Sequence, residues 1–323
     1  MQWGIHVSLA IILNMNLKHF KPAHWVYNLL HYKQLLHNKR AYRKYHIHKP
    51  LIASISSKDF PDKDSRAWLD TGDSAILAPQ KEGFGNFSPA IQQKILQWSA
   101  KGYIILDNYF AADTCDAVNN EIDSLVKKGK MHFQWDNKLM FANKKSSLIR
   151  GITKDAGISQ LLNFLLDKKM TPFQTINFIS GSGQRAHSDS VHMTTYPLGY
   201  LIAIWIALED VHPDSGPLFY YPGSHKLPYL LNNEWNKGSS FLSLGKSEYP
   251  DYEDMVEELI TKNNLQKETL LAKKGDVLIW HANLIHGGAP ILNKALTRKS
   301  MVVHYYADDV IKYHEITERP SLM

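Results

Sequence analysis

YLIAIWIAL, at residues 200–208, is one of five short apolar runs in the C-terminal half of this 323-residue chain. The others are TINFIS (175–180), PLFYYPG (217–223), ETLLAKKGDVLIWH (268–281) and RKSMVVHYY (298–306). They are rich in Ile, Val, Tyr and Trp, and turn sequences such as GSG, DSGP and HGGAP separate them. Short β-prone runs at this spacing are typical of a β-sandwich or barrel. The sequence therefore predicts a mainly β core.

The residues before this core predict helices that buttress it. Ser88-Pro89 has the pattern of a helix N-cap followed by proline at the first helical position, and Gly102 that of a helix stop. A second helix is expected over residues 113–128, and an acidic helical insert over residues 249–264. Residues 51–87 mix Ser, Asp, Pro and Gly and predict a linker. We therefore expect a helical N-terminal arm and linker over residues 1–87, and a barrel with buttressing helices over residues 88–323.

The N-terminal arm carries the basic charge of the chain. Residues 1–50 contain eight Lys or Arg and no Asp or Glu, so the remainder of a chain with net charge +6 is near −2. Trp25, Leu29, Tyr32 and Leu36 predict a helix near residues 23–40. The favoured interpretation is a helix packed on the barrel with solvated lysines, and contact with an anionic membrane surface ranks second. We expect attraction of an anionic substrate or partner, and no nucleic-acid binding because no recognised motif accompanies the charge.

Bulk composition narrows the class of protein. A hydrophobic fraction of 44% and a charged fraction of 21% are those of a globular protein. The single cysteine, Cys115, cannot form an internal disulfide and favours a reducing, cytoplasmic location. No apolar run reaches the roughly 18–20 residues that span a bilayer, and the run at residues 7–13 is not a convincing signal peptide.

The sequence GQRAHSDSVH (183–192) contains the first chemical motif. His187 and Asp189 are two residues apart, so on a strand both side chains would point to one face and could bind one metal. A histidine from a distant strand would complete a two-histidine, one-carboxylate triad, which leaves open positions on iron(II) for a chelating cosubstrate and O₂. GDVLIWHANLIHGGAP (275–290) offers His281 and His286 for this role.

The strand expected over TRKSMVVHYY (297–306) places Arg298, Ser300, Val302 and His304 on one face. A buried arginine on a barrel wall is costly unless it meets an anion. The distal carboxylate of 2-oxoglutarate is such an anion, and a guanidinium can bind it through two parallel hydrogen bonds.

The four sequences HSDSVH, LEDVHPDSGPLFYYPGSHKLP, GDVLIWHANLIHGG and TRKSMVVHYY, in this order, resemble the phytanoyl-CoA dioxygenase family over roughly residues 90–310. The resemblance implies a double-stranded β-helix, with iron(II) held by His187, Asp189 and His286 and with Arg298 bound to 2-oxoglutarate. It further implies a dioxygenase that uses 2-oxoglutarate and O₂ to hydroxylate a C–H bond of a small or acyl-type substrate, with release of succinate and CO₂.

Several positions refine this comparison. Many relatives carry a serine two residues after the distal histidine, where this chain has Gly288, and we expect Ser300 or another hydroxyl to replace it. Iron halogenases of this fold replace the ligand carboxylate with a small residue, so Asp189 favours hydroxylation. His281 is expected to be a wall residue and His225 a structural turn residue. Candidate residues of the substrate pocket, each with ordinary packing as the alternative, are His192, Thr195, Trp205 and His304.

Two other functions are compatible with the predicted fold. One is a non-catalytic barrel that serves as a binding module, and the other is a metal-dependent isomerase or hydrolase on a cupin-like barrel. The first would be favoured by loss of a ligand, and none is lost. The second would not need Arg298 or consume 2-oxoglutarate. Neither the substrate nor the oligomeric state is encoded in a recognisable motif.

Overall fold

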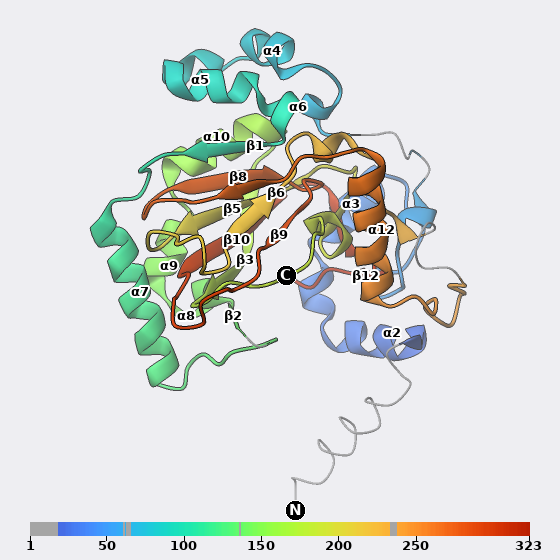
Figure 1. Cartoon of the computed structure of the whole chain (residues 1–323). Coiled ribbons are helices and arrows are strands. Elements are labelled where there is room, and N and C mark those ends of the chain that lie inside the picture. The colour runs from blue at the N-terminus through green and yellow to red at the C-terminus, as the bar shows by residue number, and fades with distance from the viewer. Residues whose placement is uncertain (1–18, 61, 63–65, 136, 233–237) are drawn as a thin grey trace, which may run out of the picture.

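The computed structural model describes residues 19–60, 62, 66–135, 137–232 and 238–323. Its centre is an antiparallel sheet in the order β1-β8-β5-β10-β3-β2 (Figure 1). These strands are β1 (Tyr103–Leu106), β8 (Val277–His281), β5 (Leu201–Ala207), β10 (Ser300–Ala307), β3 (Met170–Phe178) and β2 (Lys138–Met140). Two three-stranded sheets complete the barrel: β7 (Glu268–Leu270), β6 (Leu218–Tyr220) and β9 (His286–Gly288), and β12 (Arg319–Pro320), β11 (Ile311–His314) and β4 (Thr194–Tyr196). The predicted double-stranded β-helix with flanking helices is confirmed.

The central strands are buried on both faces, which explains why YLIAIWIAL is apolar throughout instead of alternating. Val302 pairs with Trp205 and Val303 with Ile204 in the register of β10 and β5. Ile204 and Val303 belong to the core shared with the helices, whereas Trp205 and Val302 belong to a second core that includes Leu218 of β6. The period of two along each strand thus supplies one face to the helices and the other to the barrel interior.

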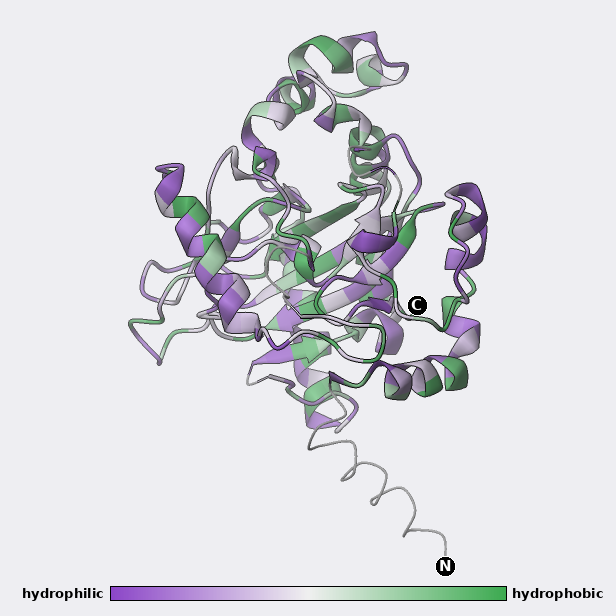
Figure 2. Ribbon diagram, turned by 90° about the vertical axis from the view of Figure 1, so that its right-hand side faces the viewer, coloured by the Kyte–Doolittle hydropathy of each residue, from purple (hydrophilic) through white to green (hydrophobic). Residues whose placement is uncertain are grey.

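Helices pack on the outer face of the six-stranded sheet, and their hydrophilic and hydrophobic residues alternate along each ribbon (Figure 2). They are α5 (Pro89–Leu96), α6 (Trp98–Lys101), α7 (Ala112–Lys127), α8 (Ala142–Lys145), α9 (Ser147–Ile152) and α10 (Ala156–Leu166). The predicted ends are confirmed, because Ser88 Oγ accepts the N–H of Ile91 and Gly102 ends α6 at a φ of 77°. Cys115 is buried on α7. None of the helices in the described ranges is long and apolar enough to cross a bilayer.

The N-terminal segment differs from the single helix predicted over residues 23–40. It forms α2 (Lys21–Leu30), a 3₁₀ turn η2 (Tyr32–Leu35) and α3 (Asn38–Lys44). The break at His31 lets Leu35 turn inward, where it packs with Tyr42 in the cluster formed on β4 and β11. Tertiary burial of Leu35 therefore overrides the helical periodicity that the sequence shows.

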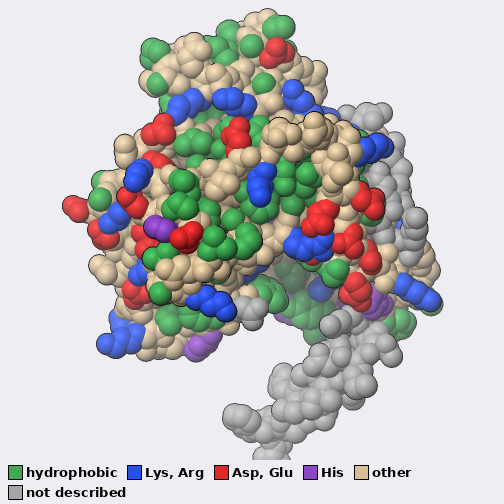
Figure 3. Space-filling view, viewed as in Figure 1, with side chains coloured by type: hydrophobic (Ala, Val, Ile, Leu, Met, Phe, Trp, Pro, Cys, Tyr) green, Lys and Arg blue, Asp and Glu red, His purple; other side chains and the backbone are tan. Residues whose placement is uncertain are grey.

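The linker expected over residues 51–87 contains several short elements. They are η3 (Ser57–Asp59), η4 (Trp68–Asp70), α4 (Ser74–Leu77), η5 (Ala78–Gln80) and η6 (Phe84–Asn86). Later in the chain, η7 (Asp189–Val191), η8 (Ser224–Lys226) and α12 (Tyr249–Lys262) interrupt the strands, and α12 is the predicted acidic insert. A domain boundary after residue 87 stays a prediction. On the face shown in Figure 3, acidic and basic side chains are interspersed.

Candidate active site

The structure brings His187, Asp189 and His286 together, with one potential ligand atom from each lying within 4.8 Å of the others. The two histidines come from neighbouring extended segments, because each backbone N–H donates to the other residue's carbonyl at 2.9 Å. The expectation that a strand places His187 and Asp189 on one face is wrong. Asp189 begins the 3₁₀ turn η7, and the backbone N–H of Ser190 donates to Ala282 O. A turn held by the neighbouring segment, not a strand, therefore aims the carboxylate.

Both histidines use Nδ1 for a backbone contact, which leaves Nε2 for the metal. His187 Nδ1 lies 2.8 Å from Arg185 O, and His286 Nδ1 lies 2.9 Å from Leu284 O. Since a carbonyl oxygen can only accept, each Nδ1 carries a proton, and in the neutral ring Nε2 keeps its lone pair. Burial, together with the nearby His286, lowers the pKa of His187 to about 3. A neutral imidazole is the form that binds a metal.

The carboxylate of Asp189 is buried but charged. Its Oδ2 accepts a hydrogen bond from Trp280 Nε1 at 2.8 Å and lies 3.5 Å from His304 Nε2. Burial alone would raise the pKa of Asp189, but the neighbouring imidazoles of His286 and His304 outweigh it and hold that pKa well below its usual range. No lysine or arginine forms an ion pair with Asp189 among the residues described. A buried carboxylate beside two buried imidazoles fits a divalent cation.

Arg298 is the second unusual charge of the site. Its side chain is 2% exposed, its Nε has no hydrogen-bond partner, and no carboxylate in the described part of the chain pairs with it. The guanidinium lies over the rings of Phe178 and Trp205, at 5.4 and 5.8 Å from their centroids. Burial lowers the pKa of Arg298 to about 10. A buried cation without a protein partner is costly, so this position is suited to an anionic ligand.

The three metal-ligand candidates and Arg298 line one cavity of about 700 Å³, within the usual range for small-molecule sites. Of the predicted pocket residues, His192, Trp205 and His304 also line it. Thr195 does not: its hydroxyl is buried and donates to Pro197 O at 2.7 Å. Ser300 is fully buried in β10 and does not line it either. Ser300 nevertheless shares a face of β10 with Val302 and His304, which line the cavity, and its Oγ has no hydrogen-bond partner.

The model of the family described as phytanoyl-CoA dioxygenase matches residues 98–300. The chain belongs to the phytanoyl-CoA dioxygenase family. The predicted enzyme class, a dioxygenase dependent on iron and 2-oxoglutarate, is confirmed by this membership and by the His-Asp-His cluster.

Two curated relatives illustrate the range of this family. The chain is 25% identical to the ectoine dioxygenase of Sphingopyxis alaskensis over 224 residues, which are 62% of this chain and 71% of that protein. It is 26% identical to the peroxisomal phytanoyl-CoA dioxygenase of Bos taurus over 132 residues, which are 40% of this chain but 35% of the bovine protein.

Solved structures support the fold. The non-heme alpha ketoglutarate dependent carbocyclase SnoK from nogalamycin biosynthesis has a TM-score of 0.57 at 16% identity, over 74% of this chain and 89% of that one. EctD from S. alaskensis, solved with 2-oxoglutarate and 5-hydroxyectoine, has a TM-score of 0.54 at 19% identity, over 79% and 86% of the two chains.

Sequence reasoning missed three residues of this family member's site. Trp280 donates a hydrogen bond to Asp189. Successive side chains of the strand VLIWH point to opposite faces, so the sequence could have placed Trp280 in the barrel interior. Lys138 lines the cavity and donates to Gln184 Oε1 at 3.1 Å, and burial lowers its pKa. Gln184 Nε2 lies 3.2 Å from His187 Nε2. Strand β2 has only three residues, which is too short for a periodic pattern that would predict the direction of the Lys138 side chain.

Gly288 stands where the family usually has serine, and the space that a side chain would need there is taken by the hydroxyl of Ser182. A side chain at Gly288 would collide with Ser182 Oγ and would crowd the backbone N of Gly183. Ser182 lines the cavity, whereas Ser300 does not. Ser182 is thus the better-placed replacement for the hydroxyl that the family pattern leads one to expect.

The two remaining candidate histidines lie outside the cavity. His281 Nε2 lies 3.0 Å from Asp70 Oδ2, and its Nδ1 accepts the backbone N–H of Asn283. The His225 ring lies 5.2 Å from the His281 ring at an interplanar angle of 57°, and the His225 carbonyl accepts from Asn283 Nδ2. Both residues therefore pack in the wall, in agreement with the sequence-based expectation.

Proposed function

We propose that this family member hydroxylates a C–H bond of a small or acyl-type molecule with iron(II), 2-oxoglutarate and O₂, and that succinate and CO₂ are released. One observation carries the proposal: a metal-ready His187–Asp189–His286 cluster and an unpaired buried Arg298 line the same cavity. A metal-dependent hydrolase or isomerase would have no use for the unpaired guanidinium.

Each residue has a distinct role in this proposal. His187, Asp189 and His286 would hold the iron on one side and leave the cavity side open. Arg298 would bind the distal carboxylate of 2-oxoglutarate and so orient it toward the metal. When bound, iron and 2-oxoglutarate supply the activation of O₂ for C–H oxidation.

The cavity wall excludes water and favours ligands with an anionic group. Phe178, Trp205 and Leu218 are buried and line it, so water is excluded from the reacting centre. Lys138 donates to Gln184 and feels the charge of Asp189, but its ammonium forms no direct ion pair with a described residue and is available to a second carboxylate in the cavity. This supports a small substrate or ligand with an anionic group. The S. alaskensis relative acts on ectoine, as its name states, which is a small molecule.

The decisive experiment is anaerobic titration of purified protein with iron(II) and 2-oxoglutarate, followed by the weak visible metal-to-ligand charge-transfer band. We expect a band in the wild type, none in Asp189→Ala and a weakened one in Arg298→Ala. Lys299→Ala is the matched control, because Lys299 is adjacent but points outward to Asp123 at 3.6 Å. Absence of the band in the wild type would overturn the proposal.

Admission of O₂ then separates catalysis from mere binding. A working oxygenase should convert 2-oxoglutarate to succinate slowly even without its substrate. A complex that forms the band but never produces succinate would favour the non-catalytic binding module.

A further inference from the structure

Helix α2 is oriented with its polar residues inward. Lys21 and Asn28 are 5% and 0% exposed, whereas Val26, Leu29 and Leu30 are 61%, 58% and 75% exposed. Residues 26, 29 and 30 lie on one face of a helix because they are three and four residues apart. A surface helix normally buries its apolar stripe and exposes its polar one. The leucine face of α2 therefore lacks a partner among the described residues.

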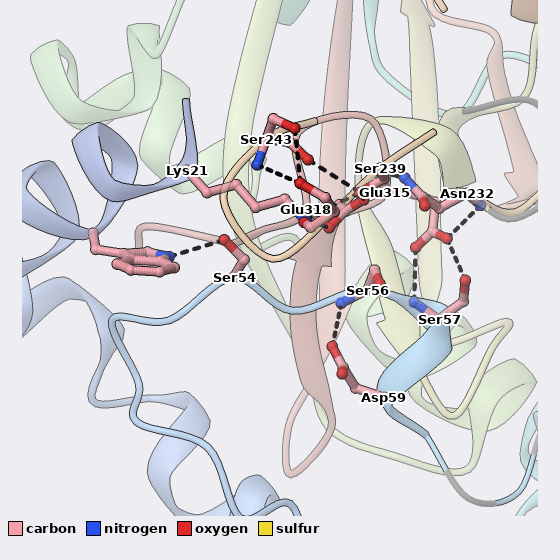
Figure 4. A network of polar contacts seen from close by, with 12 residues as sticks. Lys21, Ser54, Ser56, Ser57, Asp59, Asn232, Ser239, Ser243, Glu315 and Glu318 are labelled. Atoms are coloured by element: carbon pink, nitrogen blue, oxygen red, sulfur yellow. Dashed lines mark hydrogen bonds and ion pairs between the residues drawn. The ribbon is translucent and has the colours of Figure 1, made fainter. Parts of the chain in front are cut away.

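Hydrogen bonds hold α2 in this orientation. Lys21 Nζ contacts Glu318 and donates to Ser239 Oγ at 3.0 Å (Figure 4). Asn28 Nδ2 donates to Ile52 O at 2.9 Å, and Asn28 Oδ1 accepts from Arg319 Nη2 at 3.3 Å. Rotation of the helix to bury its leucines would break a buried ion pair, which is strongly unfavourable.

A second segment extends the exposed apolar surface. Phe241 and Leu242 are 78% and 51% exposed, and they lie against α2: the rings of Trp25 and Phe241 are 5.3 Å apart, and Lys21 N donates to Leu242 O at 2.9 Å. We call Val26, Leu29, Leu30, Phe241 and Leu242 the docking patch. Exposed apolar side chains gathered on neighbouring segments mark interaction sites on otherwise polar proteins.

Most of the charge near the docking patch is cationic, and one exposed carboxylate, Glu248, lies 3.7 Å from His19. Residues 1–50 contain no Asp or Glu, and Lys33, Lys39 and Arg43 are exposed with no acidic partner in the described ranges. A symmetric contact between two copies through this face would bring these cations together, which is repulsive. An apolar centre with a mainly cationic border instead matches an anionic lipid surface, where apolar side chains enter the headgroup boundary and lysines meet lipid phosphates.

We propose that the docking patch binds this protein to the surface of an anionic phospholipid bilayer. Helix α2 has 10 residues and lies flat in this arrangement, with Leu29 and Leu30 inserted and the Lys21–Glu318 pair on the protein side. The proposal is independent of the oxygenase reaction, because none of these residues lines the cavity.

Co-sedimentation with vesicles tests the proposal on the full chain. One set of vesicles is phosphatidylcholine alone, and the other contains about 30% phosphatidylserine. We expect binding to the anionic set that weakens as salt is raised from about 0.1 M to about 0.5 M. Leu29→Ser with Leu30→Ser, and separately Lys33→Glu with Lys39→Glu, should each lower binding at least about tenfold.

Matched controls carry the same changes elsewhere on the surface. Ile76→Ser alters a residue of α4 that is 61% exposed, and Lys127→Glu with Lys128→Glu reverses two exposed charges at the end of α7. Both controls should bind like the wild type, and circular dichroism should show all variants folded.

Three results would overturn the proposal: no binding to anionic vesicles, equal binding to both vesicle types, or binding that both α2 variant pairs leave intact. Sedimentation equilibrium tests the alternative that a second copy of the chain binds the docking patch. A dimer that Leu29→Ser with Leu30→Ser dissociates, without vesicle binding by the wild type, would assign the patch to a second copy of the chain.

Discussion

The indole N–H of Trp280 donates a 2.8 Å hydrogen bond to Oδ2 of Asp189. This contact occupies one carboxylate oxygen and leaves Oδ1, which lies 3.9 Å from His286 Nε2, for a metal. Partners of this kind orient a ligand before the metal arrives and commonly affect metal affinity as strongly as some ligands do.

Trp280→Phe should therefore weaken divalent metal binding about tenfold while the protein stays folded, because the carboxylate loses its orienting donor. Calorimetric titration with manganese(II) measures the change. Trp98→Phe is the control, since Trp98 is fully buried and its Nε1 has no partner. Equal affinities of wild type and Trp280→Phe would show that packing alone positions Asp189.

Arg298→Met should have opposite effects on stability and on ligand binding. Removal of an unpaired buried guanidinium should raise the free energy of unfolding of the ligand-free protein by about 1–3 kcal/mol. The same change should abolish the stabilisation that 2-oxoglutarate gives to the wild type, because the carboxylate loses its partner. Urea denaturation with and without 2-oxoglutarate measures both effects. Lys299→Met should reproduce neither, and a destabilised ligand-free Arg298→Met would contradict the argument.

Ser182→Ala should raise the KM for 2-oxoglutarate several-fold, as expected from the loss of a hydrogen bond of about 1 kcal/mol, with little change in kcat. Ser300→Ala should leave the KM unchanged, because Ser300 lies outside the cavity wall. Steady-state succinate production measures both. The reverse pattern would assign the cosubstrate hydroxyl to Ser300.

Gly288→Ser, which restores the family's usual residue, should impair the site instead of improving it. The new side chain would collide with Ser182 Oγ and crowd the Gly183 backbone. We expect a higher KM for 2-oxoglutarate, and the double variant Gly288→Ser, Ser182→Gly should recover part of the loss. A wild-type KM in the single variant would mean that the 181–184 segment yields easily.

Stability should fall in mild acid, and His225 should contribute to the fall. Burial and the neighbouring His281 lower the pKa of His225 to about 3, from about 6.5 in the unfolded chain. The unfolded state therefore binds the proton first, so this contribution is fully present above pH 6.5 and is lost as pH falls toward 3. Between pH 6.5 and pH 5 the loss of unfolding free energy from this source amounts to about 1–2 kcal/mol.

His225→Gln should accordingly show a shallower loss of unfolding free energy between pH 7 and pH 5 than the wild type. Chemical denaturation at several pH values measures the slope. His48→Gln changes an exposed histidine and should keep the wild-type slope. Parallel curves for wild type and His225→Gln would mean that His225 already titrates normally in the fold.

The sequence determined the class of fold and the chemical parts of the site. Apolar runs such as residues 200–208 can be stable only when both faces of the strand are covered, and the run can be recognised in the sequence itself. His187, Asp189, His286 and Arg298 could be named because their residue types are rare in apolar surroundings without a ligand.

Tertiary structure decided how these parts meet. Asp189 is aimed by a 3₁₀ turn and by Trp280, which lies 91 positions later in the chain. The hydroxyl beside Gly288 comes from Ser182. The leucines of α2 face outward because Lys21 on the opposite face forms a buried ion pair with Glu318, 297 residues away. Periodicity along a chain reports only which side chains prefer burial, whereas hydrogen bonds and packing between distant segments decide which of them are buried and what they touch.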